Sequence, residues 1–350
     1  MHRLLIVGTG SIANHHAVEF GKMAGVTIVG CADAVPERAQ AFAEKHGIAR
    51  AFGDLGEAIA WGAFDAAVNA TSDAAHKATS LALIAAGKHV FCEKPLAPTY
   101  PDALEMTEAA ERAGVINMVN LTYRNSPALQ KTHALVADGR IGALRHVAAA
   151  YLQSWLVGNH WGDWQTEERW LWRLSKTHGS TGVLGDVGIH ILDFATFGAG
   201  ETFASLKADL VTFPKAPGDR IGDYTLDAND SVAITGRLSS GALATVTATR
   251  FATGHANDLT LTLHGTGGAL RVETDGQASR LSGCLDGDIN TNTWTEIETA
   301  SVPRNAERFV TALDEGRNGE PSFRRAADVQ RLIDATFESA ASGQAVSIGG

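Results

Sequence analysis

The chain has 350 residues, of which 45% are hydrophobic and 19% charged, so it is long enough for two ordinary globular domains. Its net charge of −10 argues against nucleic acid or an anionic membrane as a partner. Three scattered cysteines without a CxxC pair, no signal-peptide pattern and no apolar run of ~20 residues predict a cytoplasmic protein with no disulfide framework, metal site or membrane span.

Short apolar runs alternate with helix-like segments over the first third of the chain. The expected strands are 4–7, 27–32, 66–69, 89–92 and 115–119, and the expected helices are 12–24, 36–46, 76–86 and 102–113. Continuously apolar strands between helices indicate a parallel sheet that is covered on both faces. We therefore predict an α/β fold whose first domain, residues 1–122, is a doubly wound parallel sheet.

The pattern changes after about residue 122. Helices are expected near 127–138, 188–197, 304–315 and 324–341, and strands at 144–151, 231–237, 242–250, 259–264 and 269–273. Alternating and β-branched runs separated by glycine turns are typical of an antiparallel sheet with one partly open face. Residues 123–350 are therefore predicted to form a second domain.

The first strand runs into the sequence Gly8-Thr9-Gly10-Ser11-Ile12-Ala13. Gly8 permits a tight turn, and Gly10 lets the backbone approach a pyrophosphate closely. A helix that begins at Ser11 and Ile12 offers unpaired N–H groups to the phosphates. The motif predicts a dinucleotide site, with a plain tight turn as the alternative.

An acid follows the second strand at the expected distance. Asp33 lies 23 residues after Gly10 and is placed to bind the ribose hydroxyls and repel a 2′-phosphate. The predicted cofactor is therefore NAD, with NADP less favoured; Arg38, one helical turn further on, is weak evidence for NADP. Thr71 follows the end of a later strand and is expected at the cofactor. His76 is a candidate there, with packing at a helix start as its alternative.

The stretch Glu93-Lys94-Pro95 follows another apolar strand. Because the carboxyl ends of parallel strands line the ligand crevice, Lys94 is expected to donate to a substrate hydroxyl and stabilise the alkoxide. Glu93 would orient Lys94 or bind the nicotinamide ribose. Pro95 fixes φ and holds the turn, and the sequence does not decide whether its bond is cis. A strand that simply ends in solvent is the alternative.

A second group of polar residues opens a helix in the second half of the chain. Asp186 and His190 are four apart and share a helix face. A histidine beside a carboxylate suits a general base that works near neutral pH, and Asp193 is a further acid for the same face. The alternative is a helix cap at Asp186 with a hydrogen-bonded histidine.

Five of the seven tryptophans fall between Trp155 and Trp172. Aromatic faces with polar groups between them suit a polyhydroxylated ring, although tryptophans also anchor loops and subunit interfaces. We expect one or two of these side chains near substrate, with Trp155 and Arg173 as candidates. Tyr123 and Arg124, just after the last strand of the first domain, are further substrate-binding candidates.

The GTGSIA turn, the EKP stretch and the segment GSTGVLGDVGIH that contains Asp186 and His190 together resemble the Gfo/Idh/MocA oxidoreductase family, the glucose–fructose oxidoreductase and inositol dehydrogenase group. The resemblance covers nearly the whole chain, including NLTYRNSP, which begins at Asn120. The sequence departs from the family pattern in having fewer glycines before Asp186, and Ser72 where the family often has proline.

The resemblance implies an N-terminal Rossmann domain and a C-terminal α/β domain whose large, mostly antiparallel sheet builds dimers or tetramers. It implies that Lys94 contacts the reacting hydroxyl, that His190 is the acid/base and that Asp186 is its partner. Asn120, at the start of NLTYRNSP, joins the candidates for cofactor binding.

The function predicted from these features is an NAD(P)-dependent dehydrogenase that acts on a CH–OH group of a cyclic sugar, an inositol-like polyol or a sugar derivative. A keto-sugar reductase that works from NAD(P)H is the first alternative, and a redox-assisted glycoside hydrolase is a more distant one. A non-catalytic NAD-binding regulator is the alternative from another class, although it would not need Lys94, Asp186 and His190.

Overall fold

The computed structural model describes residues 1–349, and its contacts divide the chain into two compact units. The first unit comprises Met1–Thr122 and Pro303–Gln330. The second comprises Tyr123–Val302 and the chain from Arg331 onward.

The first unit is built on six parallel strands in the order β3-β2-β1-β4-β5-β6. The strands are β1 (His2–Val7), β2 (Val26–Ala32), β3 (Ala51–Phe52), β4 (Ala66–Asn69), β5 (His89–Cys92) and β6 (Asn117–Val119). The helices between them are α1 (Ser11–Gly21), α2 (Pro36–His46), α3 (Leu55–Trp61), α4 (His76–Ala85) and α5 (Tyr100–Ala113). This order confirms the predicted doubly wound sheet and places its ligand crevice beside β1 and β4, where the winding reverses.

Segment 303–330 joins the first unit, whereas the predicted boundary placed it in the second domain. Phe309 of α9 (Asn305–Glu315) is fully buried and packs 5.5 Å from Phe91 of β5, measured between ring centroids. The carbonyl of Pro321 accepts a hydrogen bond from the Val119 amide, so this returning segment also continues the hydrogen bonding at β6. Sequence order alone does not show which sheet an apolar helix face covers.

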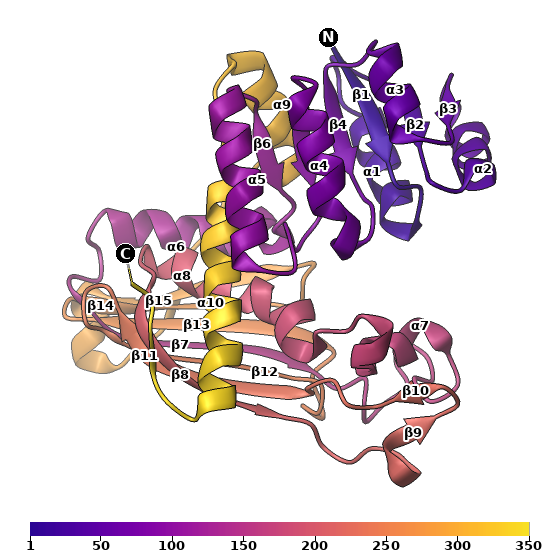
Figure 1. Ribbon diagram of the computed structural model, residues 1–350. Helices are drawn as coiled ribbons and strands as arrows, with labels where there is room; N and C mark the ends of the chain where they lie inside the picture. The colour runs from indigo at the N-terminus through magenta and orange to yellow at the C-terminus, as the bar shows by residue number, and fades with distance from the viewer. Residues whose placement is uncertain (350) are drawn as a thin grey trace. The chain divides into compact units, whose positions relative to one another are not determined.

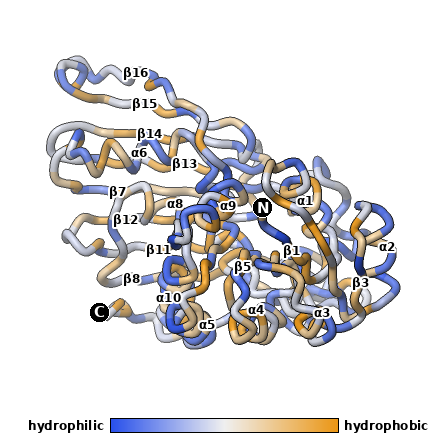
Figure 2. The backbone as a smooth tube through the Cα atoms, turned by 90° about the horizontal axis from the view of Figure 1, so that it is seen from above, coloured by the Kyte–Doolittle hydropathy of each residue, from blue (hydrophilic) through white to orange (hydrophobic). Residues whose placement is uncertain are grey.

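The main sheet of the second unit has nine strands in the order β16-β15-β14-β13-β7-β12-β11-β8-β17, and Figure 2 shows most of them lying side by side. The bounds are β7 (Leu144–Gln153), β8 (Phe203–Val211), β11 (Ser231–Leu238), β12 (Leu243–Thr249), β13 (Asn257–Gly265), β14 (Gly268–Thr274), β15 (Ser279–Leu285), β16 (Thr295–Glu296) and β17 (Val346–Ser347). Within the described residues every neighbouring pair is antiparallel except β7 and β12. The predicted mostly antiparallel sheet is confirmed.

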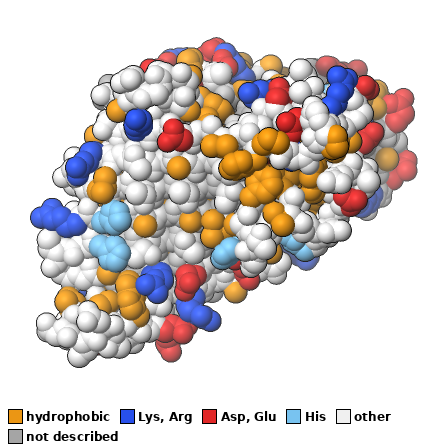
Figure 3. Space-filling model, turned by 90° about the horizontal axis from the view of Figure 1, so that it is seen from below, with side chains coloured by type: hydrophobic (Ala, Val, Ile, Leu, Met, Phe, Trp, Pro, Cys, Tyr) orange, Lys and Arg blue, Asp and Glu red, His pale blue; other side chains and the backbone are white. Residues whose placement is uncertain are grey.

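Helices α6 (Pro127–Ala137) and α8 (Ile189–Ala199) pack on one face of this sheet (Figure 1). Alternate strand residues, such as Val147 and Ala149 of β7, are buried on that side, as a period of two requires. The residues between them are only half-buried and are mostly small or hydroxyl-bearing: Ala148, Ala150, Thr245, Thr247, Thr260 and Thr262. Figure 3 shows the molecule from below, and few charged side chains lie over the middle of the sheet there.

The remaining elements are short, apart from α10 (Phe323–Ser342), which is the last helix of the described residues. A separate hairpin joins β9 (Arg220–Ile221) and β10 (Tyr224–Thr225), and α7 (Glu168–Leu171) lies in the tryptophan-rich segment. No helix in residues 1–349 combines the length and apolarity that a membrane span needs.

Candidate functional site

A cavity of about 720 Å³ opens at the carboxyl ends of β1, β2 and β4 in the first unit. It is lined by most of the residues predicted to bind the cofactor, namely Gly8, Gly10, Ser11, Ile12, Asp33, Arg38 and Thr71. Thr9, Val35 and Ser72 also line it, and these were not among the predicted site residues. Its volume lies within the range of pockets that hold cofactor-sized ligands.

The two glycines of the turn meet different surroundings. Gly8 has φ of +82°, and a Cβ there would lie 2.7 Å from the carbonyl oxygen of Ala70. A Cβ on Gly10 would meet nothing within 4 Å, and no side chain caps the helix that follows it. Gly8 therefore allows β1 to pass close to the loop after β4, while Gly10 leaves space in front of unpaired helix N–H groups. A pyrophosphate requires a cradle of this kind.

Asp33 is held in place by the turn that it faces. Its carboxylate accepts hydrogen bonds from the Thr9 amide at 2.8 Å, the Thr9 hydroxyl at 2.7 Å and the Val35 amide at 2.9 Å. Burial alone would raise the pKa of Asp33, but these hydrogen bonds and the charge of Arg38 outweigh it and lower the pKa. A fixed anion at this position fits ribose hydroxyls better than a 2′-phosphate.

His76 is fully buried at the start of α4. Its Nδ1 lies 2.7 Å from the carbonyl oxygen of Pro95, and its Nε2 lies 3.1 Å from that of Thr71. Burial lowers the pKa of His76, but the neighbouring Cys92 and the Pro95 carbonyl outweigh it and raise the pKa to about 9. The ring ties two loops together, as the packing alternative expects, and is not among the residues that line the cavity.

Glu93 is also buried, with 8% of its surface exposed. Its Oε1 lies 2.6 Å from Nε2 of His16 on α1 and accepts a hydrogen bond from the Asn120 side-chain amide at 2.8 Å. Its Oε2 accepts one from the Lys94 backbone amide at 3.2 Å. Burial raises the pKa of Glu93, but His16, Asn120 and the Lys94 amide outweigh it and lower the pKa to about 2. Glu93 therefore fixes the backbone of Lys94, while a role for Glu93 or Asn120 in cofactor binding stays a prediction.

Lys94 follows β5 and is partly exposed, and its bond to Pro95 is cis. The turn is tied through Glu93 on one side and through His76, which bonds to the Pro95 carbonyl, on the other. The strand therefore leads into an ordered turn and does not simply end in solvent.

In the second unit, Asp186 lies in a single π-helical turn, Leu184–Gly188, that leads into α8 and His190. A Cβ at Gly185 would overlap the Thr181 side chain, so glycine is needed for this turn to form. The Asn229 side chain accepts a hydrogen bond from the Leu184 amide and donates one to the Thr181 carbonyl, both at 3.0 Å. Such π-turns occur frequently at functional sites.

His190 is buried at 8% exposure, and the ring of Tyr123 meets it edge-on with 5.2 Å between centroids. The Tyr123 and Tyr151 hydroxyls are 2.6 Å apart, and both bond to the Asn257 side chain. Burial raises the pKa of both tyrosines, so the phenols stay protonated near neutral pH. Tyr123 was a predicted site residue. Tyr151 and Asn257 were not predicted, because each is a single strand residue that belongs to no recognisable sequence motif.

Three of the other candidate side chains are engaged with protein partners. Arg124 is 2% exposed and forms a bidentate ion pair with Asp193 at 2.6 and 2.7 Å, which links the segment before α6 to α8. Trp155 is 2% exposed and donates its indole N–H to Gln153. In this structure Arg124 and Asp193 bind one another, and Trp155 binds a neighbouring side chain in the core. A role at the substrate for Arg124, Trp155 or Asp193 stays a prediction.

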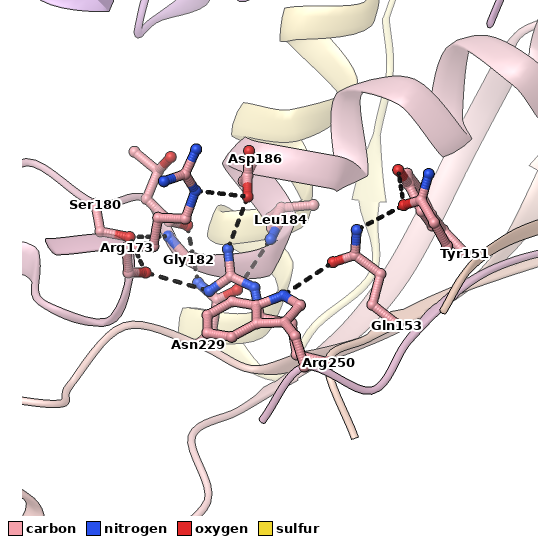
Figure 4. A network of polar contacts seen from close by, with 12 residues as sticks. Tyr151, Gln153, Arg173, Ser180, Gly182, Leu184, Asp186, Asn229 and Arg250 are labelled. Carbon is pink, nitrogen blue, oxygen red and sulfur yellow. Dashed lines mark hydrogen bonds and ion pairs between the residues drawn. The ribbon is translucent and has the colours of Figure 1, made fainter. Parts of the chain in front are cut away.

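Arg173 differs from these residues because about a third of its side chain is exposed, with its Nε 3.8 Å from Oδ2 of Asp186. A partner of Asp186 that is nearer than Arg173 was not predicted. Nη2 of Arg250, the residue after β12, donates to Oδ2 of Asp186 at 3.0 Å (Figure 4). A lone arginine after a threonine-rich strand gives no signal in the sequence.

The described part of the chain contains no group of three or more histidine, cysteine or acidic side chains that could hold a metal ion. The first unit offers a lysine on an ordered turn, and the second offers a histidine that lies four residues after a carboxylate.

Comparisons with known proteins bear on both units. A model of an oxidoreductase family with an NAD-binding Rossmann fold matches residues 2–121, and a model of the GFO/IDH/MocA C-terminal domain matches residues 129–271. Levoglucosan dehydrogenase of Pseudarthrobacter phenanthrenivorans is 28% identical over 307 residues, 78% of this chain and 77% of its own. Inositol 2-dehydrogenase of Rhizobium meliloti is 27% identical over 354 residues, 99% of each chain.

A solved structure of levoglucosan dehydrogenase in complex with NADH and levoglucosan is similar to the whole chain. The TM-score is 0.87 at 25% identity, with 99% of this chain and 98% of that chain covered.

Proposed function

This chain belongs to the Gfo/Idh/MocA family of NAD-binding oxidoreductases, and we propose that it oxidises a CH–OH group of a cyclic sugar, an inositol-like polyol or a sugar derivative. The observation that carries the proposal is the cavity formed by Gly8, Gly10 and Asp33, which fits a dinucleotide. The substrate class is supported by the similarity to levoglucosan and inositol dehydrogenases.

The proposed chemistry separates the proton from the hydride. NAD, when bound, supplies the acceptor for the hydride that leaves the substrate carbon. His190 takes the proton of the reacting hydroxyl, because a neutral imidazole is the usual base near pH 7. Lys94 donates a hydrogen bond to the same oxygen and stabilises its developing charge. Asp186 is the anionic partner that orients His190 for this proton transfer.

NAD is proposed as the preferred cofactor because Asp33 is ionised and fixed beside the cavity. Arg38 also lines the cavity, but a 2′-phosphate that reached it would have to approach the Asp33 carboxylate.

The test is the absorbance at 340 nm when the protein is mixed with NAD and a panel of cyclic sugars, inositols and sugar acids. A rise with at least one of them supports the proposal. No rise with any of them, together with oxidation of NADH by a keto-sugar, would favour the reductase. No reaction in either direction, with NADH binding intact, would favour the regulator.

We further propose that the chain forms a homodimer or homotetramer in the cytoplasm. The half-buried face of the nine-stranded sheet suits contact with a second copy, because small side chains allow close approach of flat surfaces. The three cysteines are free thiols, which persist in a reducing compartment. Light scattering of the purified protein tests the assembly, and a monomer at micromolar concentration would contradict it.

A further inference from the structure

Arg250 is a buried cation outside the sequence motifs described above. It follows β12 and is 0% exposed, among the largest fully buried side chains of the described residues. The Trp155 ring covers its guanidinium, with 4.9 Å between the ring centroid and Cζ. Burial lowers the pKa of Arg250, and the charge of Asp186 opposes that change. A guanidinium keeps its charge even so, and a buried charge is costly unless it is paired.

The buried guanidinium is hydrogen-bonded on its two terminal nitrogens. Nη2 donates to the Asp186 carboxylate at 3.0 Å, and Nη1 donates to the Arg173 carbonyl at 3.2 Å (Figure 4). Nε is buried with no partner within the described residues. The hydrogen bonds therefore connect Arg250 with the π-turn and with the segment that carries Arg173.

The other acid near Arg250 is engaged through one of its two carboxylate oxygens. Asp230 is fully buried, with its Oδ2 3.0 Å from Nζ of Lys215 and bonded to the Phe213 amide. Asp186 differs, because a third of its side chain is exposed. A fully buried cation thus holds a partly exposed carboxylate, whereas both partners of an ordinary surface ion pair are exposed to solvent.

We propose that Arg250 is a positioning residue for the reaction: it fixes the Asp186 carboxylate at the π-turn so that this anion can orient His190 and accept a hydrogen bond from the substrate. The inference rests on the proposed function. The charged or titratable groups around Asp186 include Arg250, Arg173 and, at longer range, the phenols of Tyr123 and Tyr151. Of these four, Arg250 alone is both permanently charged and fully buried.

The first test is the pH dependence of kcat in Arg250→Met and Arg250→Lys, with the best substrate of the wild-type protein. Arg250→Met is expected to lower kcat by up to about 100-fold, the loss that misplacing a catalytic group produces. The acid limb of its pH–kcat profile should move toward neutral pH, because the removed cation no longer favours the ionised carboxylate or the neutral imidazole. Arg250→Lys should restore part of kcat and shift the limb back. Binding of NADH should be unchanged.

Arg169→Met is the matched control. Arg169 also lies over a tryptophan, with Cζ 5.2 Å from the Trp170 ring centroid, and it pairs with Glu167 instead of Asp186. Its removal should leave kcat and the pH profile unchanged. A wild-type kcat and pH profile in Arg250→Met would overturn the proposal.

A stability measurement keeps the proposal testable if Arg250→Met folds poorly, and it needs no substrate. Asp186→Asn leaves the buried guanidinium without its anion and should lower the melting temperature. Adding Arg250→Met to Asp186→Asn should recover part of that loss, since the unpaired charge is gone. Losses that simply add in the double variant would show that the two residues act independently and would overturn the proposal, whether or not the wild-type protein proves to be a dehydrogenase.

Discussion

The carboxylate of Asp33 accepts three hydrogen bonds from Thr9 and Val35, so its position does not depend on a ligand. Asp33→Asn keeps the shape and an accepting oxygen but removes the charge. We expect the ratio of kcat/KM for NADP to that for NAD to rise by about tenfold or more, equivalent to roughly 1.4 kcal/mol. Glu37→Gln is the control, since it removes an exposed charge of α2 that does not line the cavity. An unchanged ratio in Asp33→Asn would contradict the role of Asp33.

The buried charge of Glu93 should make the stability of the protein depend on pH. Its folded pKa is lowered from 4.5 to about 2, so its stabilisation is present above about pH 4.5 and lost as pH falls toward 2. The shift corresponds to roughly 3 kcal/mol at neutral pH. In Glu93→Gln the melting temperature should be lower at pH 7 and should change less between pH 5 and 3.

The control for Glu93→Gln is Glu105→Gln, whose carboxylate forms an exposed pair with Lys77. This variant should follow the wild-type protein at every pH. An acid response of Glu93→Gln that matched the wild-type response would mean that Glu93 does not carry the expected charge.

Residues within a local motif could be predicted from the sequence, and isolated residues could not. Gly8, Gly10 and Asp33 follow a spacing that strand and helix geometry impose, and they line one cavity. Arg250 reaches Asp186, and Tyr151 reaches Asn257, through segments that are far apart in the chain, which a single sequence does not reveal. The burial of Arg124 was missed for the same reason, because its partner Asp193 is 69 residues away.

At the scale of elements, the turn between β1 and α1 permits a direct comparison of two glycines. Gly8→Ala would bring a Cβ within 2.7 Å of the Ala70 backbone at φ of +82°. Gly25→Ala introduces the same residue at φ of +80°, where nothing lies within 4 Å. Gly25→Ala should cost about 1 kcal/mol of backbone strain and leave NADH binding intact.

Gly8→Ala should cost more than Gly25→Ala and should weaken NADH binding severalfold. Fluorescence titration with NADH and thermal melts of both variants measure the two effects. Equal losses of stability and equal NADH affinities would show that the contact of Gly8 with the loop after β4 has no importance.

The bounds of helices that have clear start and stop residues were predicted closely. The range Pro36–His46 was predicted without error, since Pro36 starts the helix and Gly47 ends it in the left-handed conformation. The seven-residue helix Leu55–Trp61 and the two-residue strands were not predicted, because they are too short to show a period.

At the scale of the whole molecule, the type of sheet could be predicted from the sequence, but the order of its strands could not. Alternation of strands and helices predicted a doubly wound sheet, and the observed order gives its switch point beside β1 and β4. The assignment of 303–330 to the first unit depends on packing such as that of Phe309 against Phe91, which lies far earlier in the chain. Tertiary packing of this kind leaves no local mark in a sequence.

The proposed chemistry depends most directly on Lys94 as the group that stabilises the reacting oxygen. The measurement that tests it is kcat of Lys94→Met with NAD and the best wild-type substrate, alongside NADH affinity. Lys77→Met, which removes a partly exposed lysine of α4 paired with Asp102 and Glu105, is the control. We predict that Lys94→Met binds NADH like the wild-type protein while kcat falls by roughly 100-fold or more. A kcat equal to that of the wild-type protein and of Lys77→Met would contradict the proposed role of Lys94.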